Sequence, residues 1–394
     1  MLIFQSIIVY TLLTVIMCLG AYMSQKVPKF AVWSWIPIVA FTLVFGLRYG
    51  VGMDYNNYLD IYAHTEVASP AWIKDVFHLE LLPIIIIYVC HFFGTPAYVF
   101  FSIIAFIQIF FLYKAFKNEG NILIYIYLML IFSGICMLGF MNIMRQMVAT
   151  CIFLYSLQYI RDNKVMPYWA CCILAFLFHK SAIILFPMYF IWARKKGLLN
   201  SPIVELGLLA LSLMSIFLIG WQEALHSFDR VIVALGYGSY ISQMDTYMDA
   251  GGRGIGIADT FAFVIYVMIV LHSREMKEHI QSPIFNILYD MFIVGSCLAY
   301  FFKGSMLAER MLVYFTTSQF IVVAYFLRYL YETKRQNVKQ YARYLLVLMF
   351  VFFQYSRFLY YEDQNTGAYV SYFQTELHDM KDHQREELLE KYLK

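Results

Sequence analysis

Charged residues are scarce in this sequence, and that scarcity excludes an ordinary soluble globular protein. Of the 394 residues, 14% are charged and 61% are hydrophobic, whereas a soluble domain carries roughly 25% charged residues. The net charge is only +3, which gives no support to a nucleic-acid partner. Together with a mean hydropathy of +0.64, this composition predicts an all-α polytopic membrane protein.

Several familiar motifs are also lacking. The first 21 residues have no basic segment before their apolar run and are long enough to span, so no cleavable signal is predicted. The seven cysteines lie in apolar runs without metal-ligand spacing, and we interpret them as packing residues. The GGRGIG sequence at 251–256 follows no strand, so it is no dinucleotide fingerprint. No internal repeat is visible, which weakens an inverted-repeat transporter.

Apolar runs long enough to cross a bilayer recur along the chain. We expect about twelve transmembrane helices, near 2–22, 31–47, 97–113, 122–140, 143–160, 166–178, 181–193, 202–220, 258–272, 283–302, 311–331 and 341–361. These make one integral membrane domain over 1–361, with outer loops at 48–78 and 221–257. The remaining segment, 362–394, is predicted to be an acidic helical tail exposed to solvent.

The distribution of basic residues orients the spans. The basic clusters between spans fall on the cytoplasmic side if both termini face outward and the apolar run 79–93 does not cross. This run is short and contains Pro83, so we expect a re-entrant or interfacial helix there. Bulk charge bias does not explain the cations left on the outer side, which become candidates for chemistry: Arg48, Lys74, Arg145, Lys180, Arg230, Arg253, Lys303, Arg310 and Arg357.

The sequence LRYGVGMDYNNY at 47–58 concentrates polar groups at the outer end of the second span. Arg48 either reaches up to the interface or contacts a ligand. Gly50 and Gly52 either let backbone N–H groups approach a ligand or form a tight turn. Asp54 could pair with an arginine, cap the following helix or accept a proton, and Tyr58 is a candidate to contact substrate.

Three further stretches carry candidate residues. Arg145 lies just inside the fifth span, 143–160, and needs an acid, a carbonyl or an anionic ligand as its partner. His179 and Lys180 join two short spans, so they are expected in an outward recess, where His179 is either a packed residue or a neutral general base. Arg310 and Arg357 lie at outer helix ends. Several arginines in one recess suit a diphosphate, because guanidinium groups bind phosphate oxygens bidentately.

Four stretches in this order resemble the EpsG family, which is related to the Wzy O-antigen and exopolysaccharide polymerases. They are RYGVGMDYNNY, NIMRQMVATCIFLYSLQYI, AFLFHKSAIILFPMYF and ERMLVYF, and the resemblance covers roughly 1–361. Met53 departs from the small polar residue that the family commonly carries there. The resemblance implies an inner-membrane glycosyltransferase with a GT-C-like fold that uses neither a nucleotide sugar nor a metal or other cofactor.

The resemblance also implies the reaction and its partners. A glycan would pass from undecaprenyl diphosphate to a lipid-linked repeat unit on the outer, periplasmic face of the bacterial inner membrane, with membrane lipids around the protein and a chain-length regulator as a candidate partner. We expect Arg145 and Arg310 first, and Arg48 second, to hold the diphosphate. His179 is the first candidate for the base and Asp54 the second. A lipid-linked oligosaccharide flippase and a membrane acyltransferase are the alternatives.

The predicted orientation can be tested by labelling single cysteines in intact cells with a reagent that does not cross membranes. Cysteines at positions 50–58 and 240–250 should react from outside, because both segments are assigned to outer loops. The last cytoplasmic loop, 334–340, is the internal control and should react only after the membrane is opened. Labelling of 50–58 only in opened cells would invert the topology and remove the outward site.

Overall fold

The protein is all-helical over the residues described by the computed structural model. These are 2–27, 32–52, 54–65, 69–117, 122–134, 136–193, 198–218, 255–303, 306–333, 338–360 and 368–383. Within them the backbone forms helices and no strand, apart from an isolated antiparallel bridge between Arg48 and Ser371. The all-α prediction is therefore confirmed for the described chain, while most of the outer loop 221–257 lies outside the described residues.

Contacts divide the chain into two compact units, each described here by itself. The first comprises Met1–Ala193 with Ala342–Lys394, and the second Arg194–Tyr341. Whether they work as the single domain expected over 1–361 stays a prediction. The helices of the first unit are α1 (Leu2–Lys26), α2 (Val32–Gly46), α3 (Tyr55–His64), α4 (Pro70–Phe77), α5 (Leu81–Phe92), α6 (Ala97–Phe116), α7 (Ile122–Gly134), α8 (Met137–Asn142), α9 (Met144–Arg161), α10 (Val165–Phe178), η2 (Lys180–Leu185), α11 (Met188–Trp192), most of α20 (Val338–Tyr360) and η5 (Thr375–Leu377).

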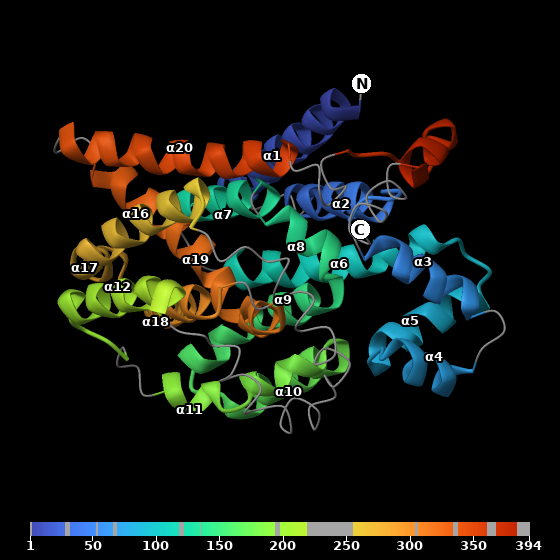
Figure 1. Ribbon diagram of the computed structural model, residues 1–394, viewed down its shortest axis with the longest axis horizontal. Helices are drawn as coiled ribbons and strands as arrows, with labels where there is room; N and C mark the ends of the chain where they lie inside the picture. Colours follow the sequence, from blue (N-terminus) through green and yellow to red (C-terminus); the bar gives the residue numbers. More distant parts are fainter. Residues whose placement is uncertain are drawn as a thin grey trace. The chain divides into compact units, whose positions relative to one another are not determined.

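The second unit is a smaller helical group. It contains α12 (Pro202–Leu218), α16 (Ile257–Leu271), α17 (Ser273–Ile280), α18 (Pro283–Phe301) and α19 (Met306–Thr333). Helix α18 packs against both α12 and α19, and α12 also contacts α16 (Figure 1). At one of these contacts Gly295 lets the backbone of α19 approach closely, because a Cβ there would lie 2.8 Å from the Phe315 carbonyl carbon.

The predicted spans coincide with helices, although several helices are broken or short. By length and hydropathy, five described helices could cross a membrane, namely α1, α6, α18, α19 and α20, and the pair α16–α17, bent by 64°, would make a sixth. Helices α2, α5, α10, α12 and the η2–α11 pair are apolar but shorter. A multi-pass membrane protein is supported, whereas the count of twelve and the GT-C architecture stay predictions.

Large apolar side chains on the outside of the first unit fit a lipid environment. Helix α1 exposes Phe4 (69% accessible), Leu12 and Leu19 (both above half) along one side, while Tyr10 and Met17 are fully buried. Patches of this kind are rare on monomeric soluble proteins. In lipid they carry no cost, because the surrounding acyl chains are equally apolar.

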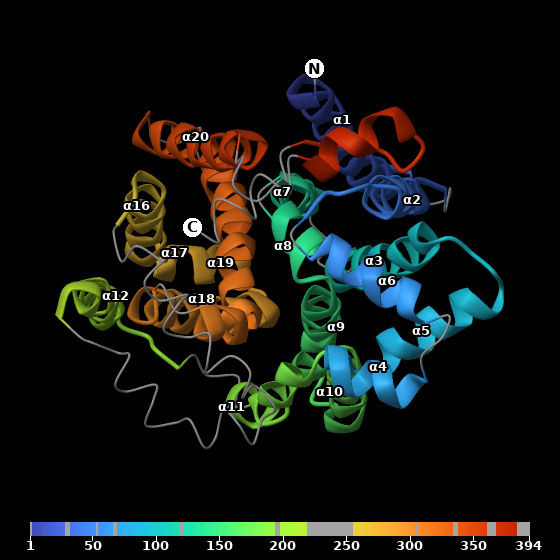
Figure 2. The ribbon, with the colours of Figure 1, turned by 45° about the vertical axis from the view of Figure 1, so that its right-hand side comes forward.

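A chain of helix contacts forms the core of the first unit. Helix α1 packs on α2 and α7, α2 on α6, α6 on α9, and α9 on α10. The short helices α4 and α5 lie side by side in both views of the ribbon (Figures 1 and 2). Helix α5 occupies most of the predicted re-entrant segment 79–93, and its mostly apolar residues also contact α6 and α10. One side of α5 is buried and the other exposes Leu81, Ile85 and Val89, so the re-entrant assignment stays a prediction.

The described part of the C-terminal tail is helical at 378–383, as expected, but the segment before this helix is bonded to α1 and α2, which was not expected. The Tyr369 N–H donates to Ser6 Oγ at 2.6 Å and the Tyr369 hydroxyl to the Val44 carbonyl at 3.1 Å. Backbone bonds at 2.8 and 2.7 Å pair Tyr49 with Val370 and Tyr372 with Leu47. Residues 368–383 thus extend along the end of α2, because that chain segment has unpaired backbone groups to satisfy.

One lysine of this C-terminal segment is buried where it meets the LRYG turn. Lys381 is 1% exposed, and its side chain lies beside Gly50. Loss of hydration disfavours the charged ammonium, and burial lowers the pKa of Lys381 to about 8 from its usual 10.5. Nearby, the Tyr49 ring stacks on His378 and its hydroxyl bonds Asp382 at 3.1 Å.

Stability of the purified protein should rise between about pH 8 and pH 10.5 through Lys381. In that window the unfolded chain holds a proton that the folded chain has lost, so unfolding becomes less favourable as pH increases. Thermal unfolding at pH 7 and pH 9.5 should therefore show a larger increase in Tm for the wild type than for Lys381→Met. Exposed Lys74→Met is the control and should keep the wild-type increase; an equal increase in Lys381→Met would contradict the assignment.

Candidate functional site

The clearest polar cluster of the first unit begins where a long apolar segment breaks into two helices. Helix α8 ends at Asn142 and α9 begins at Met144, so carbonyls near the break lose their helical partners. Buried Gln108 of α6 donates to the Phe140 and Met144 carbonyls at 3.3 and 3.0 Å. The break is therefore stabilised by side chains, as irregular backbone inside an apolar protein requires.

Arg48 is the second side chain that holds this break. It is 1% exposed and donates to the carbonyls of Phe45, Val51 and Met141, the last two at 3.1 and 3.3 Å. Its guanidinium also lies 2.9 Å from Met144 Sδ. The predicted contact of Arg48 with substrate finds no support in this geometry, because its donors are directed at the chain itself. Its role is to join the end of α2 to the start of α9.

The two glycines of the turn also serve the packing of the chain. Gly50 and Gly52 have φ values of +59° and +98°, in the region that side chains rarely adopt. A Cβ on Gly52 would lie 2.8 Å from Asn142 Oδ1 and 3.1 Å from the Met141 carbonyl oxygen. The tight-turn alternative for these glycines is thus the one the backbone displays, and Gly52 lets the turn approach the α8–α9 break.

Arg145, the second residue of α9, has an acidic partner, one of the three kinds that the sequence left open. It forms an ion pair with Glu80, and its Nε donates to the Tyr58 hydroxyl at 2.7 Å. Tyr58 is buried in α3, and its ring lies 5.8 Å from the guanidinium carbon. Since burial raises the pKa of Tyr58, the phenol keeps its own proton while it accepts from Arg145. Tyr58 and Arg145, both predicted site residues, are in direct contact.

The His179–Lys180 turn reaches the same carboxylate. The Lys180 N–H donates to Glu80 Oε1 at 3.1 Å. The charges of Glu80 and Arg145 both act on the Lys180 ammonium. His179 caps η2, since its Nδ1 accepts the Ser181 N–H at 3.3 Å and lies 2.7 Å from Ser181 Oγ. With Nδ1 accepting, the proton of a neutral imidazole sits on Nε2. In this tautomer Nε2 is a donor, and the role of His179 as the base stays a prediction.

Four segments of the first unit therefore meet around Glu80, and we call Tyr58, Glu80, Arg145, His179 and Lys180 the Glu80 cluster. Glu80 was missed in the sequence, although the acid directly preceding the apolar run LLPIIII was a signal for it. Asp54 stands at the N-cap position of α3 without a capping bond, and its charge acts on Tyr58. The capping alternative for Asp54 is wrong.

The two remaining predicted arginines lie on α20 and α19. Arg357 is exposed on the last turn of α20 in the first unit, and Arg310 is partly exposed near the start of α19 in the second. Their convergence on the Glu80 cluster, and their contact with substrate, stay predictions. Asp290, buried in the second unit, accepts the Leu198 N–H at 3.0 Å.

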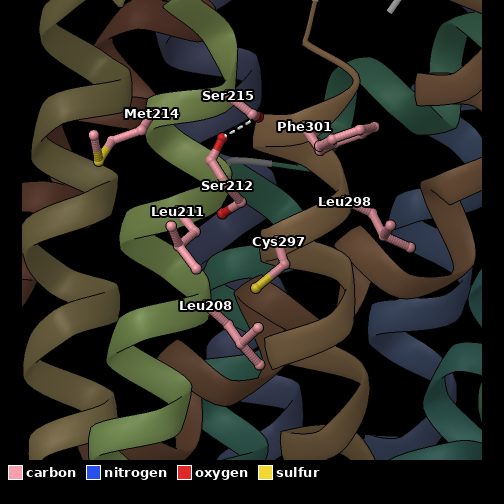
Figure 3. A pocket seen from close by; sticks show the side chains of 8 residues that line it. All are labelled: Leu208, Leu211, Ser212, Met214, Ser215, Cys297, Leu298 and Phe301. Carbon is pink, nitrogen blue, oxygen red and sulfur yellow. Dashed lines mark hydrogen bonds between the residues drawn. The ribbon is translucent and has the colours of Figure 1, made fainter. Parts of the chain in front are cut away.

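A cavity in the second unit offers no chemistry comparable to this cluster. It has a volume of about 430 Å³ between α12 and α18 (Figure 3) and is lined by Leu208, Leu211, Ser212, Met214, Ser215, Cys297, Leu298 and Phe301. The hydroxyls of Ser212 and Ser215 donate to carbonyls of their own helix, at 2.9 and 2.6 Å. The space is therefore suited to an apolar chain rather than to a reacting group.

Comparison with models of known protein families gives a match over most of the chain. The model of the EpsG family, a Wzy-like polymerase family, matches residues 31–373. Neither a curated protein nor a solved structure matches the chain. The family match extends beyond the last helix to Phe373, so it includes the first part of the C-terminal segment that pairs with residues 47–49.

Replacing Gly52 by Ala should destabilise the protein more than the same change at another glycine with positive φ. Left-handed backbone costs a non-glycine residue about 1–2 kcal/mol, and at Gly52 the methyl group also displaces the α8–α9 break. Gly94 has a φ of +60°, and nothing lies within 4 Å of the place that a methyl group would take there, so Gly94→Ala is the matched control. Thermal unfolding should rank wild type, Gly94→Ala and Gly52→Ala in falling order; equal losses would mean that the close approach is unimportant.

Proposed function

Since the chain belongs to the EpsG family, we propose that it is a membrane-embedded polysaccharide polymerase that transfers a growing glycan from undecaprenyl diphosphate to a lipid-linked repeat unit. The transfer takes place on the outer face of the bacterial cytoplasmic membrane. It draws its energy from the glycosyl diphosphate bond, so no nucleotide sugar is needed. A membrane location, a polymerase family and a buried cationic cluster support this proposal together.

The observation that carries the proposal is the position of Arg145. Its guanidinium lies at the N-terminal end of α9, with the ammonium-bearing Lys180 and the Tyr58 hydroxyl beside it. Helix N-termini and guanidinium groups both favour phosphate oxygens. When the glycosyl bond breaks, negative charge develops on the leaving diphosphate, and donors already in place stabilise it without reorganisation.

Other residues hold Arg145 in this position or add further donors for the diphosphate. Arg48 and Gln108 hold the α8–α9 break, and through it the direction of Arg145. His179, protonated on Nε2, can donate a hydrogen bond to a diphosphate or a sugar. We keep Arg310 and Arg357 as further diphosphate contacts, because charge on two phosphates exceeds what one guanidinium neutralises.

Arg145→Ala and Arg310→Ala should each abolish long-chain polymer while single repeat units stay on the lipid carrier. Loss of one preorganised donor for a developing anion typically costs about 10²–10³-fold in rate. Gel analysis of the polysaccharide, together with mass spectrometry of extracted lipid-linked repeats, measures both effects. Normal chain lengths in both variants would contradict a diphosphate role for these arginines.

Two further variants sharpen this experiment. Arg145→Lys should stay poor, because an ammonium lacks the planar fork that binds two oxygens at once. Arg161→Ala is the matched control, since Arg161 ends the same helix and pairs with the neighbouring Asp162 at 2.8 Å. It should give normal polymer. Full activity of Arg145→Lys would mean that charge alone suffices.

A further inference from the structure

The proposed reaction requires a group that takes the proton of the acceptor hydroxyl, and the Glu80 cluster contains a carboxylate that no role yet explains. Glu80 occupies the N-cap position of α5 but makes no capping hydrogen bond there. Its two oxygens turn instead to other segments, one to Arg145 and the other to the Lys180 N–H. Its side chain is only 10% exposed, so this orientation is built into the interior.

The partners of Glu80 are the donors that a phosphate would use. Arg145, the Lys180 N–H and the Lys180 ammonium surround one carboxylate, and Tyr58 completes the group through Arg145. A diphosphate that binds Arg145 must therefore share the guanidinium with Glu80 or displace the carboxylate from it. Arg145 has donors directed to both Tyr58 and Glu80, and the diphosphate competes with the Glu80 carboxylate because both are anions.

The two earlier candidates for the base fit less well. His179 accepts a backbone N–H through Nδ1 and carries its proton on Nε2. Asp54 lies one helical turn before Tyr58, and its charge acts on the Tyr58 hydroxyl. Glu80 is the carboxylate in direct contact with the group that binds the leaving diphosphate.

We propose that Glu80 is the general base of the transfer, an assignment that rests on the proposed function. The acceptor hydroxyl oxygen forms a bond to the anomeric carbon of the donor as the bond from that carbon to the diphosphate oxygen breaks. The electron pair of the broken bond leaves with the diphosphate, whose charge Arg145 stabilises. The hydroxyl proton passes to the Glu80 carboxylate oxygen that Arg145 had held, and from there to solvent.

This arrangement couples the base to the donor. Glu80 is engaged by Arg145 until a diphosphate draws the guanidinium away, while the bond from the Lys180 N–H keeps the carboxylate in place. A hydroxyl is thus deprotonated only when the donor is bound. Such an order protects the lipid-linked glycan against loss of its energy to water.

The charged and titratable groups that face Glu80 come from few elements. Arg145 of α9 and Lys180 of η2 act on it directly, and Tyr58 of α3 lies close to it. His179 is the chain neighbour of Lys180, and Asp54 stands at the start of α3, where its charge acts on Tyr58. Helix α4 carries Lys74 and Asp75, both exposed, with His78 following it, α6 carries Lys114 in its last turn, and α10 carries no charged side chain.

Glu80→Gln tests the proposal in purified protein reconstituted into lipid, supplied with lipid-linked repeat units extracted from cells that lack this chain. An amide keeps the size of the side chain but cannot take the proton, so kcat should fall by about 10²–10⁴-fold. The KM for the lipid-linked repeat and the affinity for undecaprenyl diphosphate should stay equal or improve, because a competitor for Arg145 is weakened. Asp75→Asn, an exposed acid of the same unit, is the control and should behave as wild type.

The pH profile separates a base from a residue that only positions Arg145. In wild type kcat should decline towards acid as the base is protonated, and this acid limb should vanish from the residual activity of Glu80→Gln. A kcat within tenfold of wild type, a loss confined to KM, or a retained acid limb would each overturn the proposal. If Glu80→Gln does not fold, Glu80→Asp keeps the charge but withdraws the oxygens by one methylene, and an unchanged kcat in that variant would overturn it equally.

The same assay distinguishes this inference from the proposed function. If wild type lengthens the lipid-linked glycan and Arg145→Ala does not, the function holds whatever Glu80→Gln does. An active Glu80→Gln beside an inactive Arg145→Ala overturns only the base assignment. A wild-type protein that never lengthens these repeats overturns the function and the base assignment together.

Discussion

A guanidinium group enclosed by apolar protein must find acceptors for its N–H donors, and much of the first unit is organised by this requirement. An unpaired buried charge costs several kcal/mol, so each arginine brings partners with it. Arg48 takes backbone carbonyls released at two helix ends, whereas Arg145 takes a phenol and a carboxylate. The first arginine is locked within the fold, and the second remains next to groups that a ligand could replace.

Both arginines lie where apolar helices are interrupted. The breaks after α2, between α8 and α9, and between α10 and η2 expose backbone groups and concentrate side chains that satisfy them. In a membrane protein, irregular backbone persists only where protein or an internal cavity compensates for the lost helical bonds. A site for charged chemistry can therefore form at such breaks without exposing unpaired polar groups to lipid.

The C-terminal segment adds a constraint on the same region. Residues 368–383 pair with the backbone of residues 47–49 and bury Lys381 beside Gly50. Because Arg48 in that stretch also contacts Met141 and Met144, the end of the chain, the LRYG turn and the start of α9 form one connected set of contacts.

Composition and hydropathy by themselves indicated a helical membrane protein and where most of its helices lie, whereas the family was indicated by the resemblance of four short motifs in order. These properties depend on runs of about 20 residues and on short contiguous stretches, which a sequence displays directly. The need of Arg145 for an acid, a carbonyl or an anionic ligand was also visible, since an arginine within an apolar run has few other options. Tyr58 and Lys180 were predicted as site residues, but Glu80, which links Lys180 to Arg145, was not.

Only the tertiary structure shows that Glu80 is the acidic partner of Arg145, and that Arg48 donates to backbone carbonyls. Glu80 lies 65 residues from Arg145 and 100 from Lys180, and Arg48 lies 93 residues from Met141. Helical periodicity relates residues within a turn or two and carries no record of such distant pairs. The docking of residues 368–383 was missed for the same reason, since an acidic segment indicates solvent exposure until the fold supplies backbone partners for it.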